Sequence, residues 1–201
     1  MIHWRVGLGA VLLSYLAVVG TASAAECSDA PVKVLNAGLL SAMNQGGAST
    51  FASRKAELTP VLSHAFDLPV IARLVLGKAF VELDAARRAE FTQAFGEMVY
   101  ATYASRFKQA NGVAFIIKET RPLRRSRCVV RALIERPEKD PVRLDYLVQQ
   151  RDGAWRIINV VAEGVSDLAL KRAQYGAVIQ REGFDALLDK LRMQTERLGE
   201  G

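Results

Sequence analysis

Acid–base chemistry has few candidates in this chain. The sequence holds two histidines, and only His64 lies beyond the apolar N-terminus. Its helical LSHAF context predicts a histidine at the surface or at the edge of the core. Glu163 and Asp167 flank Gly164 near the end of a predicted strand, so an acid–base pair is one interpretation. A loop carboxylate and a carboxylate at a helix start explain the same residues more simply.

Metal and nucleophile chemistry lack their usual sequence patterns. The motifs H-E-x-x-H, C-x-x-C, G-x-S-x-G and G-x-x-x-x-G-K-[ST] are all absent from the sequence. We therefore expect no catalytic residue, no metal site and no cofactor. Two alternatives stay open: an enzyme of a cone-shaped α+β fold, with a pocket Asp or His acting as a base, and a docking adaptor without a ligand.

A cluster of arginines is the most distinctive charged feature. The segment RPLRRSR, residues 121–127, lies between two predicted strands and contains Arg121, Arg124, Arg125 and Arg127. Such a cluster could bind lipid phosphates or an acidic membrane complex. A solvated hairpin loop is the simpler alternative.

The N-terminus predicts an exported protein. A positive charge at Arg5 precedes the apolar run VGLGAVLLSYLAVVG, and Ala22–Ser23–Ala24 fits a small-residue cleavage site. The run is short for a membrane span of about 20 residues. We expect a signal peptide over residues 1–24 and a single domain over 25–201; a retained anchor is the alternative.

Export makes disulfide chemistry relevant. Two cysteines follow the leader, Cys27 and Cys128, and export places them in an oxidising compartment. A bridge would close a loop of ~100 residues and stabilise the fold by ~4–5 kcal/mol. We favour the disulfide, and two unrelated thiols are the alternative.

The composition indicates a globular, basic protein. Hydrophobic residues make up 50% of the chain, charged residues 24%, and the formal net charge is +6. An exported basic protein meets anionic membrane surfaces and acidic partners, so nucleic acid is not an expected partner. Nothing in the sequence requires more than a monomer.

Helical periodicity dominates the first half of the chain. Apolar residues recur every three or four positions, and Asp67 and Gly77 are typical ends for one of the helices. The longest helix would span ~40 Å at 1.5 Å per residue. The predicted helices are about 32–43, 50–65 with an interruption at Pro60, 67–77, and 84–110.

Alternating apolar residues then predict an antiparallel sheet. Asp152–Gly153 is a strong hairpin signal, and a two-residue turn there pairs Val148 with Ile157, Tyr146 with Asn159 and Leu144 with Val161 on one apolar face. Two helices on either side of Gly183, the first capped by Ser166 or Asp167, should close over that face. The expected class is α+β, with four strands at about 113–120, 127–135, 142–150 and 154–162.

Three stretches resemble the MlaC-like, toluene-tolerance type of periplasmic phospholipid-binding proteins. They are FDLPVIARLVLGKAF at 66–80, EFTQAFGEMVYATYASRF at 90–107 and GAWRIINVVAEGVSDLALKRAQYGAVIQREGFDALLDKL at 153–191. The resemblance implies a twisted four-stranded sheet wrapped by helices around a deep apolar pocket. It further implies a periplasmic lipid carrier, without catalysis, that shuttles between an inner-membrane ABC (or RND-type) transporter complex and an outer-membrane lipoprotein complex.

The cargo is less sharply defined by the resemblance. Lys171 and Asp167 stand where many members have an aromatic and an apolar residue, and DPVRLDYLVQQRDGAWR at 140–156 is more similar to the hopanoid-associated HpnM branch. The expected ligand is therefore a phospholipid or a hopanoid.

The apolar pattern and the resemblance together select candidate lipid-contacting residues, each with ordinary core packing as its alternative. Asn159 interrupts an apolar face, so it could hold the polar end of a ligand or pair with Tyr146 or a buried water. The sheet candidates are Leu144, Tyr146, Val148, Ile157, Asn159 and Val161; the helix candidates are Val75, Phe95, Met98, Val99, Tyr103 and Tyr175.

Overall fold

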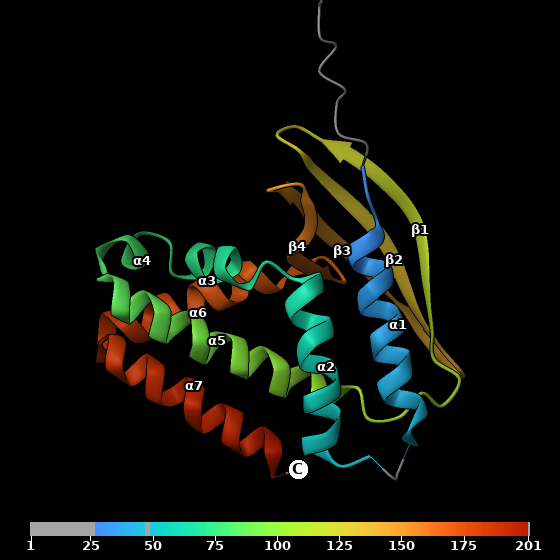
Figure 1. Cartoon of the computed structure of the whole chain (residues 1–201), viewed down its shortest axis with the longest axis horizontal. Helices are drawn as coiled ribbons and strands as arrows, with labels where there is room; N and C mark the ends of the chain where they lie inside the picture. Colours follow the sequence, from blue (N-terminus) through green and yellow to red (C-terminus); the bar gives the residue numbers. More distant parts are fainter. Residues whose placement is uncertain (1–26, 47–48, 201) are drawn as a thin grey trace, which may run out of the picture.

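The computed structural model describes residues 27–46 and 49–200, so the expected signal peptide lies outside the described residues. Figure 1 shows a curved sheet that bends around one helix, with a layer of further helices beside it. The N-terminal helices are α1 (Ala30–Asn44), α2 (Phe51–Ala65), α3 (Leu68–Leu76), α4 (Lys78–Glu82) and α5 (Ala85–Arg106). The strands β1 (Ala114–Leu123), β2 (Arg127–Arg136), β3 (Lys139–Arg151), β4 (Ala154–Ala162) and β5 (Val165–Ser166) precede α6 (Asp167–Glu182) and α7 (Phe184–Gly199).

Short polar side chains fix where several helices begin. Thr50, Asp67, Asp84 and Ser166 each accept a hydrogen bond from a backbone N–H in the first turn of α2, α3, α5 and α6. Of the two caps considered for α6, Ser166 is therefore the one used. The predicted interruption at Pro60 is wrong, because α2 continues through it. A proline inside a helix removes one backbone donor, and here the helix tolerates that loss.

The sheet confirms the predicted α+β class, with five strands instead of four. Its order is β1-β2-β3-β4-β5, and every neighbouring pair is antiparallel. The extra strand is the two-residue β5, which pairs with the end of β4. The loop expected over 121–127 is shorter than predicted, because β1 runs to Leu123 and β2 begins at Arg127.

A β-bulge in β4 changes the predicted register. Val148 pairs with Ile157 as expected, but Leu147 pairs with Asn159, so Ile158 is an extra residue. Tyr146 therefore faces Val160 and Leu144 faces Ala162, each one position from the prediction. A bulge places two residues of one strand opposite one of the other, and both Ile157 and Ile158 are buried.

Some helices pack on the sheet, and others pack mainly on neighbouring helices. Contacts to β4 come from α1, α2, α3 and α6, whereas α7 packs along α5 and α6 packs against α3 and α7. Figure 1 shows α7 on the far side of α5 from the sheet. The expectation that both C-terminal helices lie on the sheet is therefore wrong for α7. Its apolar face, with Leu187, Leu188 and Leu191 buried, packs in the helical layer.

A disulfide ties the start of the described chain to the sheet. Cys27 and Cys128 are bridged, with Cα atoms 6.0 Å apart and 101 residues apart in sequence. Cys128 lies in β2, where it pairs with Val148 of β3. The bridge thus anchors the segment before α1 to the start of β2, next to the β1–β2 turn.

Within residues 27–46 and 49–200, none of the helices combines the length and the apolar character that crossing a membrane demands.

Candidate functional site: an apolar cavity under the sheet

A cavity of about 310 Å³ lies between α5, the start of α3, the sheet and the first turn of α6. Its size and its mainly apolar wall are typical of small-molecule and lipid sites. The wall is formed by Leu39, Phe66, Leu68, Ile71, Phe95, Met98, Val99, Thr102, Tyr103, Arg106, Phe107, Ile134, Val142, Leu144, Tyr146, Ile158, Asn159, Val160, Ala162, Asp167, Leu168 and Lys171.

The inner wall of the cavity is apolar, and charged residues line its mouth. Leu39, Phe66 and Leu68 line it from the buried side of the molecule. Arg106 and Asp167 also line it, but both are exposed. A ligand with an apolar body and a charged end would therefore fit with its charge at Arg106 and Asp167.

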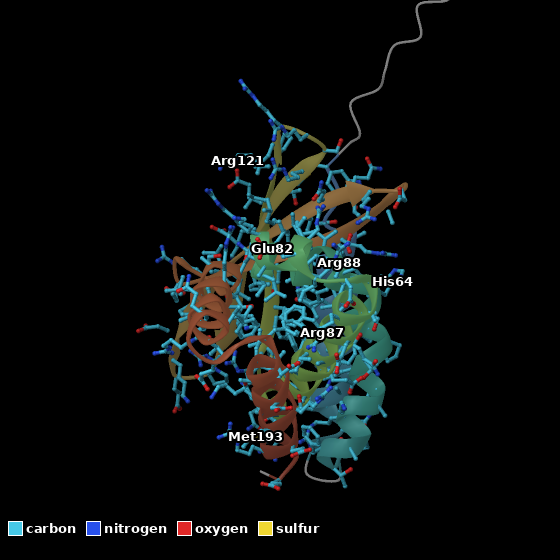
Figure 2. All side chains as sticks on the ribbon, turned by 90° about the vertical axis from the view of Figure 1, so that its left-hand side faces the viewer. His64, Glu82, Arg87, Arg88, Arg121 and Met193 are labelled. Atoms are coloured by element: carbon cyan, nitrogen blue, oxygen red, sulfur yellow. A yellow bond between two sulfur atoms is a disulfide. The ribbon has the colours of Figure 1, made fainter. Side chains whose placement is uncertain are left out.

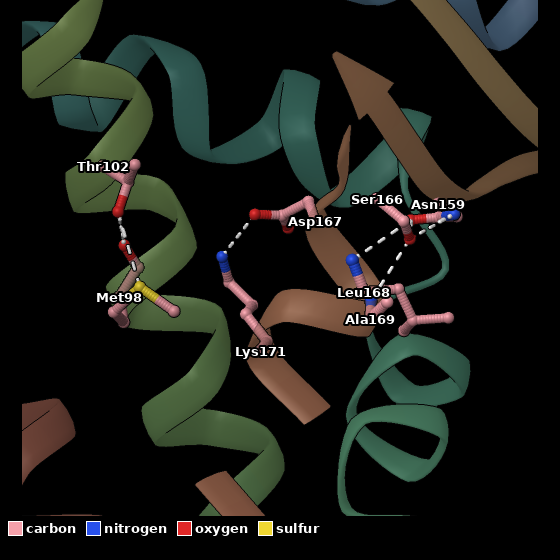
Figure 3. A network of polar contacts seen from close by, with 8 residues as sticks. All are labelled: Met98, Thr102, Asn159, Ser166, Asp167, Leu168, Ala169 and Lys171. Atoms are coloured by element: carbon pink, nitrogen blue, oxygen red, sulfur yellow. Dashed lines mark hydrogen bonds and ion pairs between the residues drawn. The ribbon is translucent and has the colours of Figure 1, made fainter. Parts of the chain in front are cut away.

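One face of α5 supplies the longest wall. Phe95, Met98, Thr102 and Arg106 recur every three or four residues, so they project from the same side of the helix. The hydroxyl of Thr102 donates to the Met98 carbonyl at 2.7 Å, which satisfies it within the helix (Figure 3). The register of α5 thus leads from buried Phe95 to exposed Arg106 along the cavity.

Aromatic packing holds Tyr103 in place. Its ring lies edge-on to Phe66 at 5.8 Å and stacks on Phe107 at 5.5 Å, measured between ring centroids. Phe107 in turn packs against Phe115 of β1. These contacts fix the phenol between the helical layer and the sheet.

Burial raises the pKa values of the two tyrosines that line the cavity. It raises the pKa of the Tyr146 phenol, and it is also the main cause that raises the pKa of Tyr103. Tyr146 and Asp167 add smaller electrostatic contributions that raise the Tyr103 pKa further, whereas Arg106 lowers it. Both phenols therefore stay protonated at neutral pH and can donate hydrogen bonds.

A polar network closes the α6 side of the mouth (Figure 3). Asn159 donates to the Ser166 hydroxyl at 3.0 Å and accepts from the Leu168 backbone N–H at 3.2 Å. Asp167 forms an ion pair with Lys171 at 2.6 Å, and the Lys171 side chain is only 18% exposed. The predicted pairing of Asn159 with Tyr146 is wrong, because the Asn159 amide binds Ser166 and Leu168 at the start of α6. Asn159 does border the cavity, and its contact with a ligand stays a prediction.

The structure brings seven of the twelve candidate lipid-contacting residues to the cavity wall. Val161 is misplaced in the prediction: the bulge turns it to the opposite face, where it borders a surface hollow with Asp145 and Arg143. Four more are buried in the core but do not line the cavity; these are Val75, Val148, Ile157 and Tyr175. Those at the wall are Phe95, Met98, Val99, Tyr103, Leu144, Tyr146 and Asn159.

Sequence reasoning missed the charged residues of the mouth. Arg106 ends the longest helix one turn after Tyr103, a spacing that could have placed it beside the pocket. Lys171 was noted only as a departure from the family pattern, and Asp167 was also considered as an acid–base candidate and as a helix cap. Their i, i+4 spacing on a helix signals an ion pair instead. Val160 and Ala162 could not be found, because the bulge leaves no sequence signal.

The other candidates for chemistry lie apart from one another. His64 is exposed at the end of α2. Glu163 binds the backbone N–H and the guanidinium of Arg143, whereas Asp167 pairs with Lys171, so the two carboxylates do not form an acid–base pair. In the described part of the chain, no three His, Cys, Asp or Glu side chains gather closely enough to hold a metal ion.

The arginine cluster lies at the far end of the sheet from the cavity. Arg127 pairs with Gln149, whereas Leu144, whose partner Ala162 also borders the cavity, lies five residues away along β3. At about 3.4 Å per residue, that is about 17 Å. Arg121, Arg124 and Arg125 are exposed, and Figure 2 shows Arg121 near one end of the molecule and Met193 near the other. None of the four arginines is among the residues that line the cavity, and their role in partner or head-group docking stays a prediction.

Comparison with known proteins identifies the family. Residues 34–193 match the family model of the MlaC protein. The chain belongs to the MlaC family. This confirms the resemblance drawn from the sequence, and the match spans α1 to α7. A solved structure, the phospholipid-binding protein from Ralstonia solanacearum in complex with a phospholipid, has a similar fold: the TM-score is 0.76 at 17% identity, over 86% of this chain and 99% of that chain.

Proposed function

We propose that this MlaC-family protein is a periplasmic phospholipid carrier, with the acyl chains held in the cavity beneath the sheet. The observation that carries the proposal is the graded wall, which runs from fully buried apolar side chains to the charges at Arg106, Asp167 and Lys171. The phospholipid in the similar Ralstonia protein supports it. No catalytic group is needed for this function.

Energetics favours exchange between apolar sites over release into water. Burying two chains of ~16 carbons gives about 25 kcal/mol relative to water, at ~0.8 kcal/mol per methylene. That exceeds the practical limit of about 20 kcal/mol for non-covalent affinity, so water is not the relevant reference state. A lipid that passes between a bilayer and the cavity changes one apolar environment for another. Direct docking on a membrane complex would let it cross without exposing its chains.

The exposed arginines of the β1–β2 hairpin are our proposed docking surface. Arg121, Arg124 and Arg125 have no ion-pair partner among the described residues. An unpaired basic tip would attract anionic lipid surfaces or acidic protein surfaces and raise the association rate. The partners would be the inner-membrane ABC (or RND-type) complex and the outer-membrane lipoprotein complex, reached after removal of the signal peptide.

Native mass spectrometry of protein purified from periplasm, followed by solvent extraction of bound lipid, tests the proposal. We expect a co-purifying glycerophospholipid. A triterpenoid would assign the protein to the hopanoid branch instead. A ligand-free mass that does not change after incubation with phospholipid vesicles would contradict the carrier function.

Adjacent residues of β4 provide a matched pair of variants. Val160 borders the cavity, whereas Val161 faces the other side of the sheet. Val160→Phe should fill part of the cavity and reduce lipid occupancy at least several-fold. Val161→Phe makes the same chemical change and should leave occupancy near that of the wild type. Equal occupancy in both variants would show that lipid binds elsewhere.

A further inference from the structure

Two phenols of the cavity wall have no hydrogen-bond partner among the described residues. Tyr146 is only 3% exposed, and Tyr103 is partly buried, with its ring packed on Phe66 and Phe107. Within residues 27–46 and 49–200, neither hydroxyl forms a hydrogen bond, and both residues line the cavity. Polar groups in a largely apolar site are stabilised by a hydrogen-bond partner, so these two donors favour a ligand with acceptor atoms at this depth.

The order of the polar groups follows the depth of the cavity. Arg106 lies at the exposed mouth, one helical turn beyond Tyr103 on the same face of α5. Tyr146 lies deeper, on β3, close enough to Tyr103 to raise its pKa. Beyond the phenols the wall is apolar, with Leu39, Leu68 and others. A ligand entering through the mouth would thus contact the cation of Arg106 first, then the neutral hydroxyl donors of Tyr103 and Tyr146, and finally the apolar inner wall.

A diacyl glycerophospholipid presents the complementary groups in the same order. Its phosphate is an anionic acceptor, its two ester carbonyls are neutral acceptors a few bonds further in, and its acyl chains are apolar. The phenols stay protonated because burial raises their pKa values, so they act as donors. Asp167 does not compete for Arg106 directly, because it is paired with Lys171 at 2.6 Å.

We propose that Tyr103 and Tyr146 donate hydrogen bonds to the ester carbonyls of a bound diacyl glycerophospholipid, while Arg106 binds its phosphate. This inference rests on the proposed carrier function and assigns the chemical class of its ligand. It predicts selection for ester-linked over ether-linked chains, and for phospholipid over diacylglycerol. Both preferences arise at the mouth and neck of the cavity, not from the acyl chains.

Competition binding between ester and ether lipids tests the phenols. The probe is a fluorescent phospholipid displaced by diacyl phosphatidylethanolamine or by its dialkyl ether analogue of equal chain length. We expect the wild type to bind the diester at least about fivefold to tenfold more tightly, because the ether analogue lacks the carbonyl acceptors of two hydrogen bonds and each bond contributes up to about that factor. Tyr146→Phe should reduce that ratio, and the double variant with Tyr103→Phe should bring it close to one.

Tyr175→Phe is the matched control for these variants. Tyr175 is also a buried tyrosine, but it packs on Phe91 and lies outside the cavity wall. It should keep the full ester preference. Thermal melting of each variant shows that it is folded, and a similar preference in the wild type and the double variant would overturn the proposal.

Comparison of a phospholipid with diacylglycerol of the same chains tests Arg106. The wild type should prefer the phospholipid, and Arg106→Gln should reduce this preference about tenfold or more, since a charge-assisted bond is lost. Arg197→Gln makes the same change at an exposed position of α7, a helix that contributes no residue to the cavity wall, and should leave the preference intact. Equal losses in both variants would contradict the phosphate assignment.

The outcomes separate this inference from the carrier function. If diester and diether lipids bind with equal affinity, the protein is still a carrier but the phenols do not recognise ester carbonyls. If neither lipid displaces the probe and none co-purifies, the carrier function itself fails. If a triterpenoid binds more tightly than both glycerolipids, the ligand assignment is wrong.

Discussion

The Asn159 side-chain oxygen accepts a hydrogen bond from the Leu168 backbone N–H at 3.2 Å, which joins the last full strand to the first turn of α6. The first N–H groups of a helix have no partner within the helix, so a side chain from elsewhere can stabilise its start. Ser166, the residue just before α6, caps the same turn by accepting a hydrogen bond from the Ala169 backbone N–H. The mouth of the cavity is therefore held by a strand residue as well as by the helix itself.

Substitution of Asn159 should separate its acceptor role from its size. Asn159→Ala removes the bonds to Leu168 and Ser166, and we expect the free energy of unfolding to fall by about 1–2 kcal/mol. Asn159→Asp keeps an acceptor next to a helix N-terminus, where negative charge is favourable, so it should lose much less. Urea denaturation measures both. Similar losses in the two variants would show that the acceptor is not what matters.

Arg54 should be a major stabilising residue of α5. It is 6% exposed, its Nε donates to the Ala104 carbonyl at 3.0 Å, and its Nη1 donates to the Ser49 carbonyl. Arg54→Met removes both bonds near the C-terminal turn that carries Arg106. We expect a loss of about 2–3 kcal/mol in the free energy of unfolding, measured with urea. The control Arg156→Met, at an exposed position of β4, should change stability little; equal effects would contradict the assigned role.

Removal of the disulfide should destabilise the fold without changing the cavity wall. The bridge closes a loop of 101 residues, and the chain-entropy model gives about 4–5 kcal/mol for a loop of that length. The double variant Cys27→Ser/Cys128→Ser should unfold at a correspondingly lower denaturant concentration. Thiol titration of the unreduced wild type provides the check, since two reactive thiols per chain would show that the bridge does not form.

Alkaline pH should destabilise the protein through its buried tyrosines. Burial raises the pKa of Tyr146 and of Tyr175 above the ordinary value of about 10. The unfolded chain then releases protons that the folded chain keeps, so the contribution of these two groups to stability is constant below pH ~10 and falls as pH rises above it. The slope is about 1.4 kcal/mol per pH unit for each such group. Urea denaturation across this pH range measures the slope of the free energy of unfolding. Tyr175→Phe should remove the contribution of one tyrosine to that slope. An unchanged slope would contradict the raised pKa of Tyr175.

Neutralising the hairpin tip should weaken binding to anionic membranes. Each basic residue near such a surface contributes about 1 kcal/mol, so Arg121→Gln/Arg124→Gln/Arg125→Gln should bind anionic vesicles far more weakly in a flotation assay. The effect should shrink as salt concentration rises. The control triple variant Arg73→Gln/Arg181→Gln/Arg197→Gln removes the same charge elsewhere. Equal losses would indicate that net charge acts, and not the hairpin tip.

Local sequence rules predicted most of the fold because local chemistry decides it. Asp152 and Gly153 have positive φ angles of 51° and 77°, as a tight hairpin turn requires, and Val148 pairs with Ile157 as that turn predicts. The caps at Asp67 and Ser166 also lie where the sequence placed them. Each of these features depends on residues close together in the chain.

The cavity wall was harder to predict because it depends on what covers each residue. Val75 and Ile71 lie one turn apart on α3 and both are buried, but only Ile71 borders the cavity. Ile157 is covered because Phe66 bridges to it and the Asp67 N–H donates to its carbonyl at 2.9 Å. Apolar periodicity indicates burial, and burial does not distinguish a filled core from an enclosed space.

The extra residue at Ile158 has a consequence for how relatives of this chain should be compared. Val160 and Val161 are identical neighbours that face opposite sides of the sheet, as consecutive strand residues do, and the bulge decides that Val160 is the one that faces the cavity. In a homologue that lacks the bulge, a residue-by-residue alignment would exchange inside for outside over the last few positions of β4. Variation at position 160 should be constrained by volume, and variation at 161 by strand propensity alone. A one-residue gap in this strand thus changes which side chains border the cavity without any substitution among the residues that follow it.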